Sequence, residues 1–167
     1  MSDNHQRINQ DSGDTEYYTD PLIIEAAREV MGGIDLDPAS SVVANKIVKA
    51  IKFFTKEDDG LDQMWSGRVW MNHPFSRAQN PLWISSLISF YEAGEILQSC
   101  NITYAATSEA WFQPLLPHLQ CFLCPRTNYY LPDGTKKVGV TKGSVVTYLG
   151  ENRNKFIDVF SKFGVCK

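Results

Sequence analysis

Residues 69–76 read Val-Trp-Met-Asn-His-Pro-Phe-Ser, and this stretch decides the fold. Its three apolar residues predict a buried strand. Pro74 has no backbone N–H to donate, so the strand must end before it, in a turn that begins with Asn72. In doubly wound sheets, ligands bind beyond the carboxyl ends of the strands. The turn formed by Asn72, His73, Pro74 and Phe75 is therefore a candidate site.

Helix and strand patterns alternate on both sides of this stretch. Thr19 or Asp20 followed by Pro21 predicts the start of a helix, which Gly32-Gly33 ends. Further helices are predicted at 80–98, 109–118 and 155–163, and strands at 34–37, within 48–54, and at 102–106, 121–124 and 144–149. The alternation predicts an α/β fold, with a mainly parallel sheet covered by helices on both faces.

Length and composition predict a single domain. The chain has 167 residues, 43% of them hydrophobic, which is enough for one core. Residues 1–14 are polar and lack periodicity, which predicts a disordered tail before a domain at 15–167. The sequence contains no run of about 18 apolar residues and no apolar leader, so we predict a cytoplasmic protein without a membrane segment.

Cysteine content and charge narrow the classes of function. The four cysteines are predicted to be free thiols, because nothing indicates secretion. Cys121 and Cys124 have the spacing of a metal knuckle, but no second ligand pair follows, so no metal site is predicted. The net charge of -3 argues against a protein that coats nucleic acid nonspecifically. Lysine clusters within 46–56 and 136–142 leave a local basic face open.

The Asn72 turn suits methylation of an amino group on a nucleic-acid base. The lone pair of such a nitrogen is delocalised into the ring, so the nitrogen is a poor nucleophile. The carboxamide oxygen of Asn72 and the backbone carbonyl of His73 can accept both amino hydrogens and aim the lone pair at a methyl donor. Phe75 can stack on the base, and Pro74 stiffens the turn. Taken alone, Asn-x-Pro-Phe is also a common turn sequence.

Several motifs occur together in a fixed order. They are Glu16-Tyr17-Tyr18-Thr19, Asp35-Leu36-Asp37-Pro38, Phe53-Phe54-Thr55 with Asp58-Asp59-Gly60-Leu61, Trp65-Ser66-Gly67-Arg68, Asn72-x-Pro74-Phe75-Ser76, and later Trp111-Phe112, Arg126 and 143–146. From residue 16 to about residue 149, the chain on these motifs resembles the phage-type DNA N6-adenine methyltransferase (Dam) family. The resemblance implies a Rossmann-like class I methyltransferase that is site-specific for DNA and uses S-adenosylmethionine.

The resemblance also implies which residues bind the cofactor. Asp35 and Asp37 would face the amino acid end of S-adenosylmethionine, with Pro38 completing that strand end. Asp59 would lie near the ribose or adenosine. Tyr17 or Tyr18 would pack on the cofactor adenine, and Thr19 would add a polar contact. The division of labour among the carboxylates stays open.

A methyltransferase of this kind would flip its target adenine out of double-stranded DNA. The candidate DNA-contacting residues are Ser76, Arg77, Arg126, Tyr129, Lys136 and Lys137. A structural hairpin around residues 132–134 explains the last part of this set equally well. Because the chain is short, the tail, the segment 128–142 or the second subunit of a homodimer would have to grip the DNA. Protection of phage DNA from restriction, in the host cytoplasm, is an expectation from the resemblance.

One position departs from the family motif, which reads Asn-Pro-Pro-Tyr or Asn-Pro-Pro-Phe. His73 replaces the first proline, so that residue's restraint on the backbone is lost while the backbone carbonyl remains. We expect a structural or tuning role for the imidazole rather than a role as general base. Two other functions stay open: a catalytically inactive methyltransferase-like binding module, and a methyltransferase with an RNA or protein amide acceptor.

Overall fold

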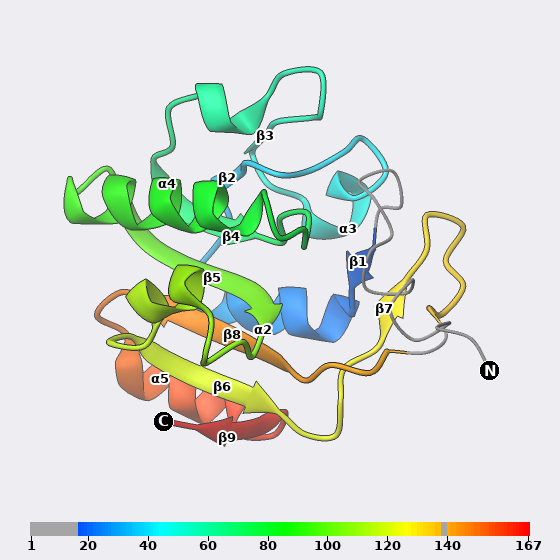
Figure 1. The fold of residues 1–167 in the computed structure, drawn as a ribbon, viewed down its shortest axis with the longest axis vertical. Coiled ribbons are helices and arrows are strands. Elements are labelled where there is room, and N and C mark those ends of the chain that lie inside the picture. The colour runs from blue at the N-terminus through cyan, green and yellow to red at the C-terminus, as the bar shows by residue number, and fades with distance from the viewer. Residues whose placement is uncertain (1–16, 138–139) are drawn as a thin grey trace.

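The computed structural model describes residues 17–137 and 140–167 (Figure 1). The strands are β1 (Tyr18–Thr19), β2 (Leu36–Asp37), β3 (Lys52–Phe53), β4 (Gly67–Met71), β5 (Ile96–Tyr104), β6 (Leu119–Leu123), β7 (Tyr129–Tyr130), β8 (Ser144–Leu149) and β9 (Gly164–Cys166). The helices are α2 (Pro21–Met31), α3 (Asn45–Val48), α4 (Asn80–Glu92) and α5 (Arg153–Phe160), with 3-10 helices η1 (Gly60–Asp62) and η2 (Ala110–Leu115). The predicted tail at 1–14 lies outside the described residues.

Seven strands form one sheet in the order β3-β2-β4-β5-β8-β6-β9, and β1 pairs with β7 separately. The pairs among β3, β2, β4 and β5 are parallel, whereas β8 is antiparallel to β5 and β6, and β9 is antiparallel to β6. The prediction of a mainly parallel sheet is therefore wrong for the half of the sheet that β8, β6 and β9 form. The described connection from β6 to β8 contains no helix that would carry the chain back across the sheet, so β8 runs in the reverse direction.

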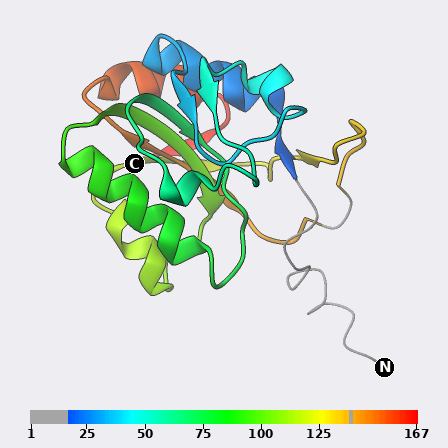
Figure 2. The same ribbon diagram turned by 90° about the horizontal axis from the view of Figure 1, so that it is seen from above.

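Helices cover both faces of the sheet, as predicted (Figure 2). Helices α2 and α5 pack together on one face, and α4 and η2 pack together on the other. Strand β4 serves both layers because its side chains alternate: Trp70 belongs to the core beneath α2 and α5, and Val69 and Met71 belong to the core beneath α4. The sheet is therefore buried on both sides.

Three helix predictions need correction: the helix predicted at 109–118 is the shorter 3-10 helix η2, and two others differ at their ends. The first helix is as predicted: the Asp20 carboxylate caps it by accepting from the N–H of Leu22, and Gly32 ends it at a φ of 77°. Helix α4 ends at Glu92 rather than at 98, because Gly94 adopts a φ of 77° and the chain from residue 96 pairs with β4. The final helix stops at Phe160, and β9 follows it.

The four cysteines are free thiols, and Cys121 and Cys166, which face each other across β6 and β9, form no disulfide. Among residues 17–137 and 140–167, no group of three or more His, Cys, Asp or Glu side chains could hold a metal ion. Within the same ranges, no helix is long and apolar enough to cross a membrane.

Candidate active site at the carboxyl edge of the sheet

The two predicted motifs follow neighbouring strands at the point where the strand order reverses. After β2, the chain moves outward to β3, then returns to β4 on the other side of β2 and continues to β5. Such a switch point is where open α/β sheets bind ligands. Asp37 ends β2 and Asn72 follows β4, and these strands are parallel neighbours. The structure therefore brings the two motifs to one place.

The β2 end is closely packed against the loop that carries Asp59. A Cβ built on Gly60 would lie 1.9 Å from the carbonyl oxygen of Pro38, so only glycine fits there. The indole of Trp65 donates to the Gly60 carbonyl at 2.7 Å and anchors the same turn. Asp59 itself is exposed, and its carboxylate accepts from the N–H of Leu61. Asp59 thus lies on a loop that touches the β2 end.

Asp37 is a buried carboxyl with little compensation. It is 2% exposed, its carboxylate accepts the backbone N–H of Ala39 at 3.2 Å, and the Ser40 side chain is its other polar neighbour. Burial raises the pKa of Asp37 from 3.8 to about 7, because the charged form loses its hydration. A cationic ligand would stabilise the charged form of a carboxyl that is buried in this way. Thr19 adds a second buried polar atom, an Oγ1 that has no hydrogen-bond partner within the described ranges.

The carboxamide of Asn72 is oriented by the N-terminal segment. Its Nδ2 donates to the backbone carbonyl of Tyr17 at 3.0 Å, which turns Oδ1 the other way. Within residues 17–137 and 140–167, neither Oδ1 of Asn72 nor the carbonyl of His73 accepts a hydrogen bond. The two acceptors that were predicted to hold an amino group are thus both available.

Phe75 lies in an aromatic group beyond the strand ends. Its ring centroid is 4.7 Å from that of Tyr104, at the carboxyl end of β5, and 6.2 Å from that of Tyr129 in β7. It is half-buried, whereas Pro74 before it is exposed. Lys142 places its ammonium 5.1 Å from the centre of the Tyr104 ring. A cation and three aromatic rings therefore follow one another from the surface inward.

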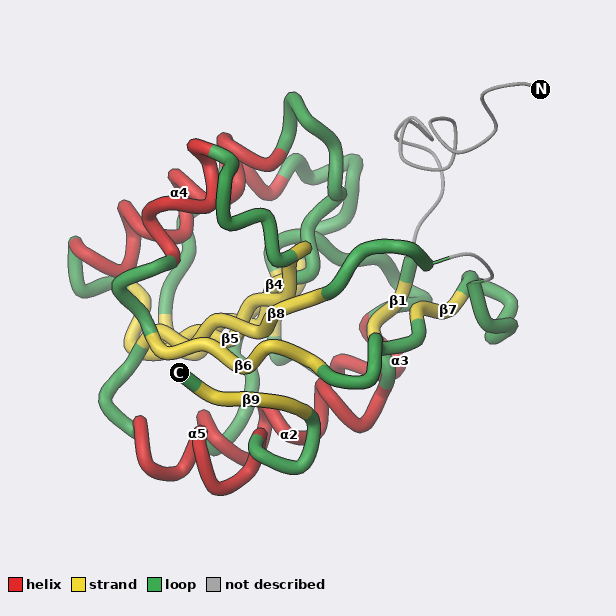
Figure 3. The backbone as a smooth tube through the Cα atoms, turned by 60° about the horizontal axis from the view of Figure 1, so that its bottom comes forward, coloured by secondary structure: helices red, strands yellow, loops and turns green. Residues whose placement is uncertain are grey.

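Strand β1 joins the separate parts of the site. Tyr17 receives the Asn72 hydrogen bond at its carbonyl, and the hydroxyl of Tyr18 lies 3.2 Å from Oγ of Ser41 in the loop after β2. β1 and β7 lie side by side, apart from the main sheet (Figure 3). The ammonium of Lys137 contacts the hydroxyl of Tyr17 and lies 4.3 Å from its ring centre. The N-terminal segment thus spans the loops that follow β2 and β4.

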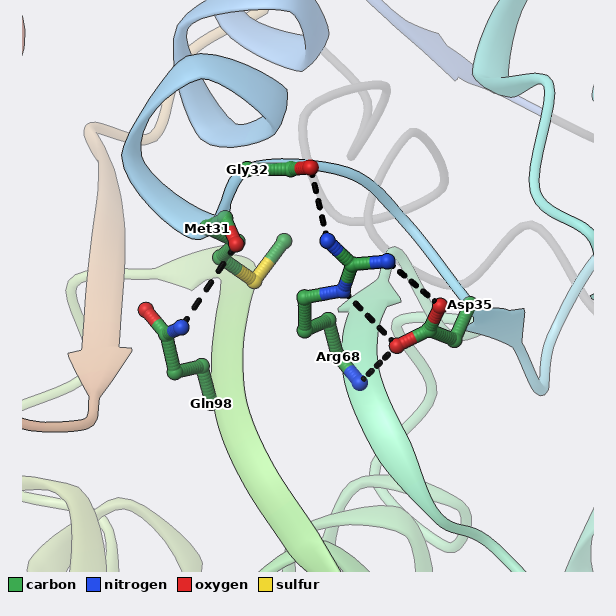
Figure 4. A network of polar contacts seen from close by, with 5 residues as sticks. All are labelled: Met31, Gly32, Asp35, Arg68 and Gln98. Carbon is green, nitrogen blue, oxygen red and sulfur yellow. Dashed lines mark hydrogen bonds and ion pairs between the residues drawn. The ribbon is translucent and has the colours of Figure 1, made fainter.

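The structure pairs Asp35, one of the predicted cofactor residues, with Arg68. Its two carboxylate oxygens accept from the Arg68 side chain at 2.7 and 2.8 Å, and a second arm of the same guanidinium donates to the Gly32 carbonyl at 2.6 Å (Figure 4). Arg68 stands near the start of β4, roughly 13 Å along the strand from Asn72. The hydrogen bonds from Arg68 lower the pKa of Asp35. Asp35 and Arg68 form an ion pair, and Arg68 also links the end of α2 to β4 through the Gly32 carbonyl.

The candidate DNA residues divide into exposed and buried members. Arg77, Arg126 and Lys136 are exposed, and Ser76 is half-buried, with its Oγ accepting from the N–H of Gln79. Tyr129, in contrast, is 3% exposed, and its hydroxyl lies 2.7 Å from Oγ of Ser144. Because packing and this hydrogen bond occupy the Tyr129 side chain, its prediction as a DNA contact is corrected to a core role.

The segment around 132–134 is a hairpin turn. The sequence had left this structural role open beside a role in DNA contact. The N–H of Gly134 donates to the Leu131 carbonyl, and the Asp133 carboxylate accepts from Thr135. The hairpin pairs Tyr130 with Lys136. It places the exposed Lys136 and the half-buried Lys137 next to β1, so a structural hairpin still keeps basic side chains at this edge.

Sequence reasoning missed three residues of this region: Tyr104, Lys142 and Asn80. The signal for Tyr104 was present, because it falls within the strand predicted at 102–106 and near that strand's carboxyl end. Lys142 belonged to a noticed lysine cluster but had no role assigned. Asn80, which bonds His73, carries no signal in the sequence, since only folding brings the first turn of α4 beneath the Asn72 turn.

The fold and the candidate site define the class: an α/β protein with candidate ligand-binding residues at the switch point of the sheet. The chain belongs to the DNA N-6-adenine-methyltransferase (Dam) family, whose sequence model matches residues 7–157. Membership implies DNA adenine methyltransferase activity. A comparison with curated proteins finds no match.

Proposed function

We propose that this protein transfers a methyl group from S-adenosylmethionine to N6 of adenine at specific sites in double-stranded DNA. The observation that carries the proposal is the orientation of Asn72, whose Nδ2 is engaged by the Tyr17 carbonyl while Oδ1 and the His73 carbonyl stay available. Two acceptors on consecutive residues match the two hydrogens of one amino group. Family membership supplies the substrate class.

In this proposal, Asn72 and His73 act on the amino nitrogen of adenine, which is the nucleophile. By accepting both amino hydrogens they draw the nitrogen out of conjugation, so that its lone pair is directed at the methyl carbon. Phe75 holds the plane of the flipped base, and Pro74 limits the motion of the turn. Positioning of this kind can supply a large part of the rate. S-adenosylmethionine supplies the activated methyl group when bound, so no protein nucleophile is needed.

The residues at the β2 end fit this cofactor chemically. Asp37 is a buried carboxylate that lacks a cationic partner within the described residues, and the ammonium of the cofactor provides one. Thr19 offers a hydroxyl that has no partner in the same residues. Tyr17, Tyr18, Pro38 and Asp59 complete the proposed binding set, with Tyr18 already fixed against Ser41. Asp35 is left out because Arg68 occupies it.

The proposed DNA surface surrounds the Asn72 turn. Lys137 stacks on Tyr17, which holds Asn72, and Lys142 stacks on Tyr104, which contacts Phe75. Both ammonium groups therefore flank the proposed base position, where the phosphates of an extruded nucleotide would lie. Ser76, Arg77, Arg126 and Lys136 extend this surface; Tyr129 does not belong to it.

Three broader expectations belong to the same proposal. A single domain at 15–167 is supported by two cores that share one sheet. A homodimer would enlarge a small DNA-binding surface. Action in the cytoplasm, of the host cell if the gene is phage-encoded, with protection of DNA from restriction, follows from the resemblance to the phage-type family.

The test is methyl transfer itself. Purified protein is incubated with S-adenosylmethionine and unmethylated DNA, and the digested nucleosides are analysed by mass spectrometry for N6-methyldeoxyadenosine. We expect the product with the wild-type chain and its loss with Asn72→Ala, while calorimetry shows unchanged cofactor binding by that variant. Methylation of RNA or protein amide alone would contradict the DNA substrate. Cofactor binding without any transfer would instead indicate an inactive binding module.

A further inference from the structure

The turn that carries Asn72 is held from beneath by the side chain of His73. The imidazole is 2% exposed, and its Nε2 lies 2.8 Å from Oδ1 of Asn80, the first residue of α4. Because the amide oxygen can only accept, Nε2 carries the proton and donates it. Asn80 is itself 7% exposed, so this hydrogen bond is shielded from water.

Aromatic rings hold the imidazole on two further sides. It stacks on Trp83, with ring centroids 6.3 Å apart and an interplanar angle of 23°, and it meets the edge of Phe75 at 5.4 Å and 80°. Trp83 is fixed in turn, because its indole donates to Gln79 and its ring stacks on Trp65 at 5.8 Å. Contacts on three sides allow the imidazole, and with it the His73 backbone, few alternative positions.

We infer that His73 and Asn80 form a positioning pair, which supplies without a proline ring the backbone restraint that the family motif obtains from proline. This inference rests on the proposed function. The imidazole acts on the backbone that presents its own carbonyl and the Asn72 carboxamide. Asn80 touches neither substrate nor cofactor in this scheme and acts only through His73, so it is a positioning residue. The neighbouring Pro74 stiffens the other side of the same turn.

The imidazole stays neutral in this role. Burial lowers the pKa of His73 to about 4, and the hydrogen bond that the ring donates to Asn80 opposes that effect only in part. Nδ1 is buried and has no hydrogen-bond partner in the described part of the chain, so the contact with Asn80 is the polar contact that the ring makes there. The pair therefore differs from a general base in both its protonation and its connections.

A double-mutant cycle tests the pair, because the inference predicts that one substitution loses its effect in the presence of the other. The four proteins are the wild type, Asn80→Ala, His73→Pro and the double variant. In the wild-type background, Asn80→Ala should lower kcat about tenfold or more and leave KM for S-adenosylmethionine within about twofold. With His73→Pro already present, the same change should alter kcat less than about twofold. Asn80→Asp, which keeps an acceptor, should retain most of the wild-type kcat.

An equal loss of kcat in both backgrounds would overturn the inference, since Asn80 would then act through α4 and not through His73. A readout that needs no activity separates this inference from the proposed function and covers variants that fold poorly. Imidazole ¹⁵N NMR of the wild type should show a neutral ring protonated at Nε2 down to about pH 5. Asn80→Ala should shift that resonance and speed amide hydrogen exchange at His73, Phe75 and Ser76. Unchanged exchange would contradict the pair, whether or not the wild type methylates DNA.

Discussion

Asp37→Asn should change stability and cofactor affinity in ways that only a buried cofactor carboxylate explains. The folded-state pKa of Asp37, about 7, lies above its ordinary value of 3.8. The stability that this carboxyl contributes is therefore complete below about pH 3.8 and is lost as the pH rises through 7. Between pH 5 and pH 8, the wild type should lose up to roughly 3 kcal/mol of unfolding free energy that the variant keeps, since a tenfold change in protonation is about 1.4 kcal/mol.

The same substitution should weaken binding of S-adenosylmethionine. A charge-assisted hydrogen bond contributes about 1.5–3 kcal/mol, so the Kd at pH 8 should rise by at least about tenfold. Urea denaturation at pH 5 and pH 8 measures the stability difference, and calorimetry measures the Kd. Asp35→Asn is the matched control, because Arg68 holds that carboxylate away from the site. It should bind the cofactor like the wild type.

Two results would refute this reasoning. If Asp37→Asn bound S-adenosylmethionine as tightly as the wild type, the carboxylate would have no cationic partner in the complex. If the stability difference did not grow between pH 5 and pH 8, the Asp37 carboxyl would not be the buried titrating group that the geometry implies.

Three further changes test other parts of the site. Arg68→Ala should lower the free energy of unfolding by about 1–2 kcal/mol, measured by denaturation, and leave kcat unchanged, because the ion pair is partly exposed and lies at the other end of β4. Lys142→Ala should raise the Kd for DNA several-fold and reduce its salt dependence, as fluorescence anisotropy would show. Lys162→Ala is its control, since Lys162 stacks on Phe163 at the same 5.1 Å but lines a hollow beside α2; an equal effect of both would contradict the proposed surface. Phe75→Ala should lower kcat by about tenfold or more while cofactor affinity stays the same, and a parallel loss of cofactor affinity would argue against its role as a base-stacking residue.

Much of the fold could be predicted because local patterns report local constraints. Asp20-Pro21 and Gly32 mark the ends of α2 through capping and a left-handed φ, and Pro74 marks the end of β4. The long helix prediction at 80–98 failed where apolar residues continue from a helix into a strand. Ile96 is as apolar in β5 as it would be in α4, so periodicity alone could not separate them.

Some residues of the candidate site could also be predicted from local patterns, and others could not. Asn72, Phe75 and Asp37 could be predicted because each follows a recognisable strand, and strand ends of an α/β sheet converge on one edge. The partners of Asp35 and Tyr129 could not be predicted, because they are distant in sequence: Arg68 pairs with the first, and Ser144 bonds the second. No local pattern encodes a partner that is 15 or 33 residues away.

The sequence by itself determined the family, the α/β class and the position of the Asn72 turn after a buried strand, because these depend on residue types in order along the chain. Only the tertiary structure decided the direction of β8, the pairing of β1 with β7, and the contact of His73 with Asn80. These depend on which buried surfaces and hydrogen-bonding groups find each other across long stretches of chain. Such choices follow from the packing of the whole molecule, which no single segment contains.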